Sequence, residues 1–195
     1  MDFKARLLEA VAGRNRGLLM TESDKVKILS AVEKLEDHNP NPKPFEVKPL
    51  LDGDWRLLFT TSRDILGIDR FPLFQLGQIY QCIRMSSAKL YNVAEIVGVP
   101  FLEGFVSVAA TFEPVSDKRV NVKFERYMVG SQRLVGYQNP KQFIEALEGG
   151  KKVLPADITS DNPRSGGWLE VTYLDEDLRI GRGNQGSVFV LAKEK

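Results

Sequence analysis

Segments of alternating apolar and polar residues dominate the chain between residues 54 and 192. In the clearest of them, 118–129, Val120, Val122, Phe124 and Arg126 share one face, and the residues between them take the other. A period of two is typical of a β-strand with one buried face. The pattern predicts strands near 54–61, 77–84, 88–97, 104–113, 118–129, 168–173, 177–182 and 187–192.

Most of these predicted strands are joined by short, turn-rich segments, and no helix alternates with them. This argues against a parallel α/β sheet. The segments 174–177 and 183–186 are rich in Asp, Asn and Gly, which favours hairpins. About eight antiparallel strands close naturally into a barrel whose interior is filled or holds one small ligand. The fold class we predict is therefore mainly β, an antiparallel eight-stranded β-barrel with an N-terminal helical appendage.

The appendage precedes the alternating region. Residues 3–12 and 23–37 carry apolar residues at helical spacing, with Ser23 as a possible cap and Thr21–Asp24 matching a capping box. The prolines of 39–44 forbid helix and favour an extended connector. We divide the chain into a helical segment 1–38, a Pro-rich linker 39–49 and a barrel domain 50–195. The apolar stripe of the second helix predicts that it packs on the barrel.

Composition excludes several classes of function. A net charge of +1 and a pI near 7.8 give no electrostatic case for nucleic-acid binding. The single cysteine, Cys82, excludes an intramolecular disulfide, and the single histidine, His38, excludes a His–His metal site within one chain. We assign no metal and no cofactor. The first residues mix acids and bases, and no run approaches the roughly 18 apolar residues of a membrane span, so we expect neither a secretory signal nor a spanning helix.

Four features look catalytic but have simpler explanations. Gly181–Gly186 spells a dinucleotide fingerprint, yet a strand follows it where a helix is required. Ser86–Lys89 and the later elements in 160–166 mimic the order of serine β-lactamase motifs, but the later elements almost touch in sequence. The acids of 175–177 suit a turn, and His38 suits a solvated helix end. We therefore predict no catalytic residues and no enzyme activity.

Two long connections stand out from the short turns. The first, 62–76, is unusually apolar and contains Phe71 and Phe74. It is interpreted as a plug on the barrel end, a lid over a ligand or a patch that dips into lipid, and the apolar hairpin tip 97–102 adds to this interpretation. The second, 140–167, is predicted to hold a short helix at 140–148.

Two arginines are in phase with apolar residues. Arg126 follows Val122 and Phe124, and Arg182 follows Leu178 and Ile180. We expect both arginines to point inward. A buried guanidinium needs a partner because it does not deprotonate. That partner is an internal acid such as Glu170 or the polar head of a bound lipid. For each arginine we favour an internal ion pair, or exposure of the side chain at the end of its strand, over contact with a ligand.

Three segments carry a family resemblance. Leu51–Ser62, Gly77–Gln81 and, above all, Trp168–Leu191 resemble the fibrillin family, also called plastid lipid-associated proteins, over about residues 50–192. The family occurs in plants, algae and cyanobacteria. The resemblance implies a lipocalin-like barrel, association with thylakoids and plastoglobules, and roles in storing carotenoids or other prenyl lipids and in photoprotection. It supplies no agreed catalytic residues.

A second resemblance concerns the barrel entrance. Gly53-Asp-Trp55 is similar to the Gly-x-Trp that opens lipocalin barrels, where a late-strand arginine packs over the tryptophan. Arg182 or Arg179 is the matching arginine. The residues that we expect to contact ligand are Trp55, Phe71, Phe74, Phe124, Arg126 and Arg182.

These inferences predict a non-enzymatic lipid-binding or lipid-carrying protein of photosynthetic membranes or lipid bodies, with a role in photoprotection. Its expected partners are an apolar small molecule (a prenyl lipid, a carotenoid or a fatty-acyl lipid) and a peripheral membrane or lipid-body surface. The alternatives are a barrel like that of bilin-chromophore lyases and a structural coat protein with a filled core. The start at Met1 indicates a cyanobacterial protein, cytoplasmic or peripheral on thylakoids, whereas a processed plant protein would lie in the plastid.

Overall fold

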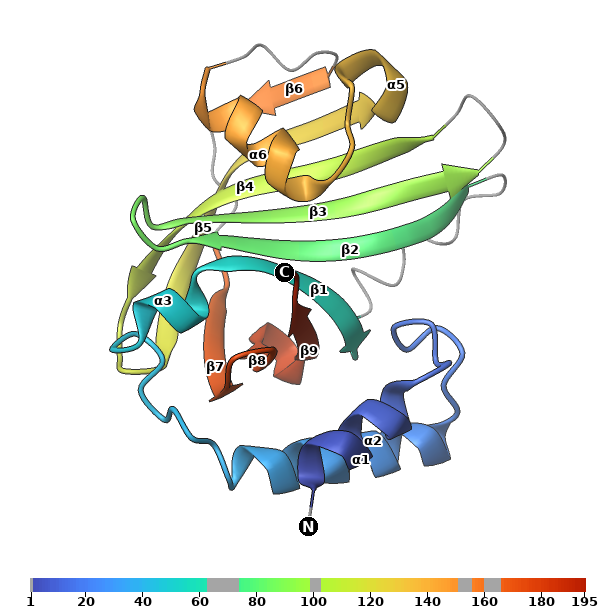
Figure 1. Ribbon diagram of the computed structural model, residues 1–195, viewed down its shortest axis with the longest axis vertical. Coiled ribbons are helices and arrows are strands. Elements are labelled where there is room, and N and C mark those ends of the chain that lie inside the picture. The colour runs from blue at the N-terminus through green and yellow to red at the C-terminus, as the bar shows by residue number, and fades with distance from the viewer. Residues whose placement is uncertain (1, 63–73, 99–102, 151–155, 160–165) are drawn as a thin grey trace.

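The computed structural model describes residues 2–62, 74–98, 103–150, 156–159 and 166–195 (Figure 1). Within these residues, eight antiparallel strands form a closed barrel in the order β4, β3, β2, β1, β9, β8, β7, β5, and the pairing of β5 with β4 closes the ring. The strands are β1 (Gly53–Thr60), β2 (Phe74–Arg84), β3 (Lys89–Gly98), β4 (Gly104–Pro114), β5 (Arg119–Ser131), β7 (Trp168–Leu174), β8 (Leu178–Gly183) and β9 (Val188–Lys193). The eight-stranded barrel that the alternation predicts is confirmed.

Two details of the strands differ from the prediction. β2 begins at Phe74, so the last three residues of the expected connector 62–76 belong to a strand. A short additional strand, β6 (Ala156–Thr159), pairs with β5 outside the ring and lies within the expected loop 140–167. Its four residues are too few to show a period of two. The residues 63–73 and 99–102 lie outside the described part of the chain.

The two expected N-terminal helices are present as α1 (Phe3–Val11) and α2 (Glu22–Glu36). The N-cap of α2 is Thr21, not Ser23, because the Thr21 side chain accepts from the Asp24 amide and the Asp24 carboxylate accepts from the Thr21 amide. This is the capping box that the sequence predicts.

The remaining helices are short. The expected helix at 140–148 is confirmed as α6 (Pro140–Glu148). Sequence patterns did not predict α3 (Lys48–Leu51) and α5 (Gln132–Val135), which span four residues each. The glycine-rich segment forms a hairpin turn with one turn of 3-10 helix, η2 (Asn184–Gly186), where the Gly183 amide donates to the Ser187 carbonyl at 2.9 Å. The hairpin interpretation of Gly181–Gly186 is thereby confirmed.

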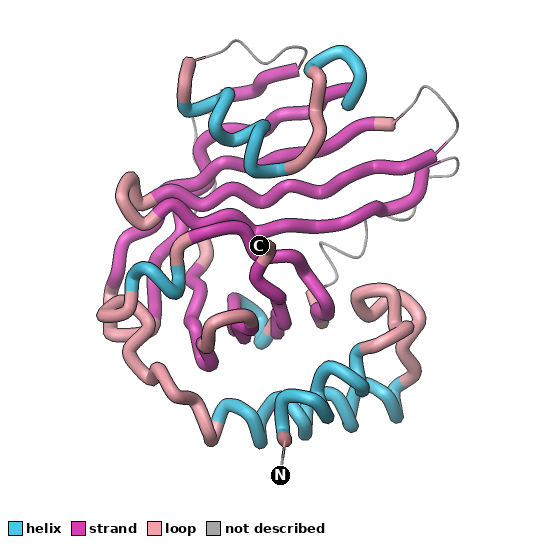
Figure 2. Tube along the Cα trace, in the orientation of Figure 1, coloured by secondary structure: helices cyan, strands magenta, loops and turns pink. Residues whose placement is uncertain are grey.

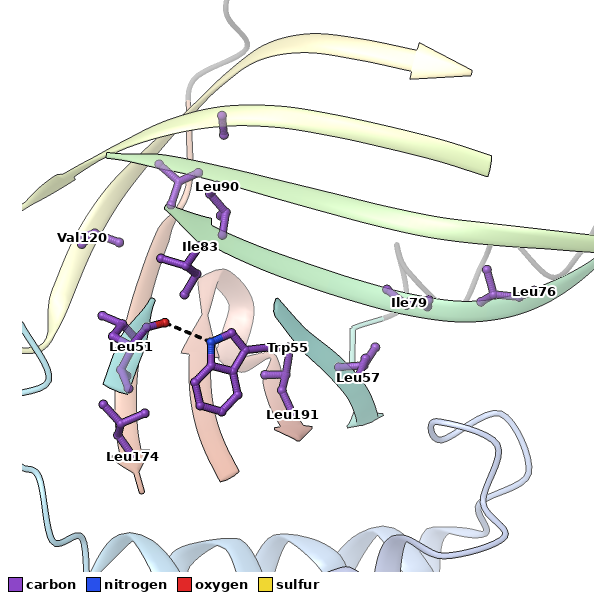
Figure 3. Packing of buried hydrophobic residues seen from close by; sticks show 13 residues of the cluster. Leu51, Trp55, Leu57, Leu76, Ile79, Ile83, Leu90, Val120, Leu174 and Leu191 are labelled. Carbon is purple, nitrogen blue, oxygen red and sulfur yellow. Dashed lines mark hydrogen bonds between the residues drawn. The ribbon is translucent and has the colours of Figure 1, made fainter. Parts of the chain in front are cut away.

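Three apolar clusters hold these elements together. The first lies inside the barrel and includes Trp55, Leu57, Ile83 and Val171 (Figure 3). The second joins α1 and α2 to the outer face of β1, β8 and β9, and the third joins α6 to the outer face of β2, β3, β4 and β5. Figure 2 shows the helices as layers outside the strands. Large parts of the barrel are therefore buried on both faces.

The appendage is fastened to the barrel by polar contacts as well. The Glu36 carboxylate at the end of α2 accepts from Arg182 Nε at 2.9 Å and from Arg182 Nη2 at 2.6 Å. Beyond the helix, the Asn39 side chain donates to the Thr172 carbonyl and accepts from the Leu174 amide. At the same end of the layer, where the Phe3 ring lies 4.5 Å from the His38 ring, Lys4 in α1 pairs with Asp175 and Asp177 in the β7–β8 turn. No helix in the described residues is both long and apolar enough to cross a membrane.

The packing of α2 gives a prediction with a matched control. Ile28 is 0% exposed and belongs to the cluster between the helices and the barrel, whereas Val26, on the same helix, is 67% exposed. We expect Ile28→Ala to lower the free energy of unfolding by about 2–5 kcal/mol, because it leaves a cavity beneath the helix. Val26→Ala should change it by less than about 0.5 kcal/mol. Urea denaturation measures both, and equal effects of the two substitutions would show that α2 is not docked.

Candidate ligand site inside the barrel

Trp55 lies inside the barrel near the start of β1. Gly53, two residues before it, has a φ of +124°, a region that glycine tolerates best, at the point where α3 turns into the strand. The indole is 0% exposed, and its Nε1 donates to the Leu51 carbonyl at 3.0 Å (Figure 3). This bond satisfies the polar atom of an otherwise apolar side chain, so Trp55 has a fixed position in the core.

Arg179 on β8 lies over the ring of Trp55, with its Cζ 5.0 Å from the ring centroid. The side chain is 1% exposed. Its Nη2 donates to Gln81 Oε1 at 2.5 Å, and Gln81 Nε2 donates in turn to Asn92 Oδ1 at 3.1 Å. Its Nε and Nη1 are buried and have no hydrogen-bond partner among the residues that the structure describes. A fully buried guanidinium therefore retains unused donors inside the barrel.

The electrostatics of this region are one-sided. Burial lowers the pKa of Arg179 to about 9, which leaves the guanidinium charged at neutral pH, and it forms no ion pair with any described residue. A second cation is close by, because Lys193 Nζ lies 5.2 Å from the Trp55 ring centroid. Lys193 donates to the Leu50 carbonyl at 2.7 Å, and burial also lowers its pKa. The interior therefore carries positive charge around Trp55. At Arg179, no described carboxylate is in contact to neutralise that charge.

An apolar pocket leads to the guanidinium. Arg179 is the one charged residue among the described residues of its lining, and the cavity holds about 20 Å³. Three half-buried side chains, Phe45, Phe112 and Leu169, stand where the lining approaches the surface. The rest of the wall is buried and consists of Leu51, Ile83, Leu90, Val120 and Val171. As it stands, the cavity takes about one small group, because a water molecule needs roughly 10–15 Å³ by a comparable measure.

The pocket is suited to binding and not to nucleophilic chemistry. Its lining offers apolar surface and a cation, without a serine, cysteine, histidine or carboxylate. Cys82, the one cysteine of the chain, is fully buried in the cluster beneath α6, on the opposite face of β2. Burial strongly raises the pKa of its thiol and thereby suppresses the reactive thiolate. Among the described residues, no group of three His, Cys, Asp or Glu side chains is placed to hold a metal ion.

The structure decides between the two arginines that the lipocalin resemblance left open. Arg179, not Arg182, covers Trp55. Arg182 shares its face of β8 with Leu178 and Ile180, as the alternation predicts, but that face points outward to α2, where Arg182 pairs with Glu36. The expected inward orientation of Arg182 is wrong because the helical appendage buries the outer face of the strand.

The inward orientation expected for Arg126 is also wrong. Ala109 on β4 pairs with Arg126, whereas Ala110 pairs with Phe124, so Glu125 is an extra residue in β5. Such a bulge moves the following residues to the other face. Phe124 packs against the interior cluster as expected, but Arg126 lies beside Ala109 in the outer layer beneath α6.

The other expected ligand contacts have different outcomes. Trp55 lies at the site, Phe71 lies outside the described residues, and Phe74 is described only by its backbone in β2.

Sequence reasoning missed Gln81 and Asn92, although a signal for Gln81 exists. Gln81 is in phase with Ile79 and Ile83, two inward-facing residues, so it is a polar residue on an apolar face.

The fold and the pocket define a closed, lipocalin-like antiparallel barrel with an apolar interior that carries a buried cation. The chain matches the PAP_fibrillin family model over residues 1–192 and belongs to that family.

The chain is 32% identical to a light-induced chloroplastic protein of Solanum tuberosum, over 98% of this chain and 67% of that protein. It is 32% identical to chromoplast-specific carotenoid-associated protein C1 of an Oncidium hybrid cultivar, over 99% of this chain and 69% of that protein. It is 31% identical to probable plastid-lipid-associated protein 2 of Arabidopsis thaliana, over 98% of this chain and 70% of that protein. No solved structure matches the chain.

The burial of Cys82 gives a prediction about reactivity. We expect no reaction with Ellman's reagent in the native protein at pH 8, because the thiol is buried and its raised pKa keeps it protonated. In guanidinium chloride one thiol per chain should react. The absorbance of the released thiolate measures both. Stoichiometric labelling of the native protein within minutes would contradict the packing of α6 over β2.

Proposed function

We propose that this protein is a non-enzymatic lipid-binding protein that takes an apolar ligand into its barrel. The observation that carries the proposal is the apolar pocket that leads to the buried guanidinium of Arg179. Apolar walls stabilise a hydrocarbon or prenyl chain by area, at roughly 25 cal/mol per Å², and a few polar groups set its orientation. The ligand classes that suit this chemistry are prenyl lipids, carotenoids and fatty-acyl lipids.

The setting that we propose is a photosynthetic membrane or a lipid body, with a role in photoprotection. Relatives named for plastid lipids, for carotenoids and for induction by light support this. Their names also place them in chloroplasts or chromoplasts, which supports a plastid or, in a cyanobacterium, a thylakoid-associated location. We propose peripheral association with the lipid surface.

Entry of a lipid requires the pocket to widen from its 20 Å³. The residue best placed for this is Phe45, which is half-buried and lies in the connector between Pro44 and α3. Backbone in such a connector has few ladder hydrogen bonds to break, in contrast to the strands that carry most of the wall. Displacement of the Phe45 ring would uncover the apolar wall without opening the barrel.

A second function, a structural coat protein with a filled barrel, is favoured by the small size of the same cavity. The two proposals differ in what the interior does. A carrier binds one lipid per barrel and responds to changes in the pocket, whereas a coat protein binds lipid only through its outer surface.

The experiment uses N-phenyl-1-naphthylamine, a neutral apolar probe whose fluorescence rises in apolar sites. We expect one probe per chain, and we expect Phe45→Ala to bind it at least threefold more tightly because the pocket is enlarged. Phe3→Ala is the matched control, since Phe3 is a partly buried phenylalanine of the outer helical layer. It should leave the affinity unchanged.

Two outcomes would contradict the carrier function. One is the absence of stoichiometric probe binding to both the native protein and Phe45→Ala. The other is an equal change in probe affinity caused by Phe45→Ala and by Phe3→Ala. Native mass spectrometry of protein purified from its host adds a second readout, because a carrier should retain a lipid-sized mass that extraction with organic solvent removes.

A further inference from the structure

We propose that the pocket selects lipids with a carboxylate head, bound head-inward against Arg179. This inference rests on the proposed function and specifies its ligand. It starts from the two guanidinium nitrogens of Arg179, Nε and Nη1, that are buried without partners. Buried donors in folded proteins are almost always satisfied, so two unsatisfied ones on one side chain need an explanation.

Structural closure of the barrel explains only part of the arrangement. Stacking on Trp55 and the bond from Nη2 to Gln81 hold the side chain in place. The stacking draws on the positive charge, but an indole ring is not an anion and does not compensate the lost hydration of the guanidinium. A buried cation without an anion lowers stability, since its lost hydration is not compensated. The charge therefore points to a partner that arrives from outside the chain.

The sign of the local charge makes that partner an anion. Lys193 adds a second positive charge on the same indole ring, with Asp52 as a nearby acid outside the pocket, and the described residues of the pocket lining include no acidic residue. A guanidinium binds a carboxylate through paired, charge-assisted hydrogen bonds, which are roughly twice as strong as neutral ones. An alcohol head offers a single neutral oxygen and leaves the positive charge uncompensated.

The hydrogen-bonded chain from Arg179 fixes how the head can bind. Gln81 accepts from Arg179 with its oxygen and donates an amide hydrogen to Asn92, so both ends of its amide already have partners. The groups left for a ligand at this point are the N–H donors of the guanidinium. The apolar wall then receives the tail, which passes outward between Phe45 and Phe112.

The first test compares ligands on the native protein. Dodecanoate and dodecanol share a twelve-carbon chain and differ in the head, so displacement of N-phenyl-1-naphthylamine at pH 8 isolates the contribution of the carboxylate. We expect dodecanoate to bind at least tenfold more tightly, which corresponds to about 1.4 kcal/mol. Equal affinities would overturn the inference, while displacement by both ligands would leave the proposed lipid-binding function standing.

The second test changes the receptor. Arg179→Met keeps the length of the side chain and removes its charge, so the tenfold preference for dodecanoate should be lost while dodecanol binds as before. The melting temperature without ligand should stay the same or rise, because an unpaired buried charge is removed. A preference for dodecanoate that survives the substitution would overturn the inference. So would a large fall in melting temperature with an unchanged preference, which would make Arg179 a structural residue.

Arg119→Met is the matched control. Arg119 also stacks on a tryptophan, with its Cζ 4.3 Å from the Trp168 ring centroid, but it is exposed and pairs with Glu170 on the outside of the barrel. It should leave both the affinity and the preference unchanged. If Arg179→Met fails to fold, the comparison of dodecanoate with dodecanol on the native protein still decides the question.

Discussion

The guanidinium of Arg179 lies on the indole ring of Trp55, and the strands of the barrel close around this pair. The two residues come from β8 and β1, which are separated by β9 in the ring, so their contact passes over the inner face of β9. The indole is held by the Leu51 carbonyl of α3 and the guanidinium by Gln81 of β2. The cation thereby becomes part of the core, and the unmatched charge that this leaves is the basis of the proposed ligand site.

Two layers outside the strands determine what the rest of the barrel can do. α1 and α2 cover β1, β8 and β9, and α6 covers the strands from β2 to β5. Both layers bury apolar surface that would otherwise face water, so these parts of the barrel have two buried faces. Reactive or charged groups on the outer face are enclosed as well: Cys82 lies beneath α6, and Arg182 is paired with Glu36.

This double burial explains which parts of the structure the sequence could predict. Alternation identifies a strand by its period, and all eight barrel strands were found in this way, whereas α1, α2 and α6 were predicted from helical spacing and from helix start and stop signals. Alternation does not identify which face is inside when both are apolar, and Leu178 and Ile180, which line up with Arg182, are buried on the outside. The resemblance to the lipocalin Gly-x-Trp, in contrast, rests on the position of Trp55, and it retained Arg179 as a candidate.

The remaining misses have separate physical causes. The bulge at Glu125 leaves no mark on the alternation and moves Arg126 to the outer layer. The four-residue elements α3, α5 and β6 are shorter than the repeat that would reveal them. Gln81 becomes part of the site only through its contact with Arg179, which lies far away in the sequence, and Asn92 joins the site through its bond to Gln81.

A crystal structure of the protein with dodecanoate tests the central claim most directly. The account predicts a single ligand inside the barrel, with its carboxylate oxygens within hydrogen-bond distance of the Arg179 guanidinium and its tail leaving between Phe45 and Phe112. Two results would contradict it: a ligand bound with its tail inside the barrel and its carboxylate at the protein surface, or a barrel that contains no ligand.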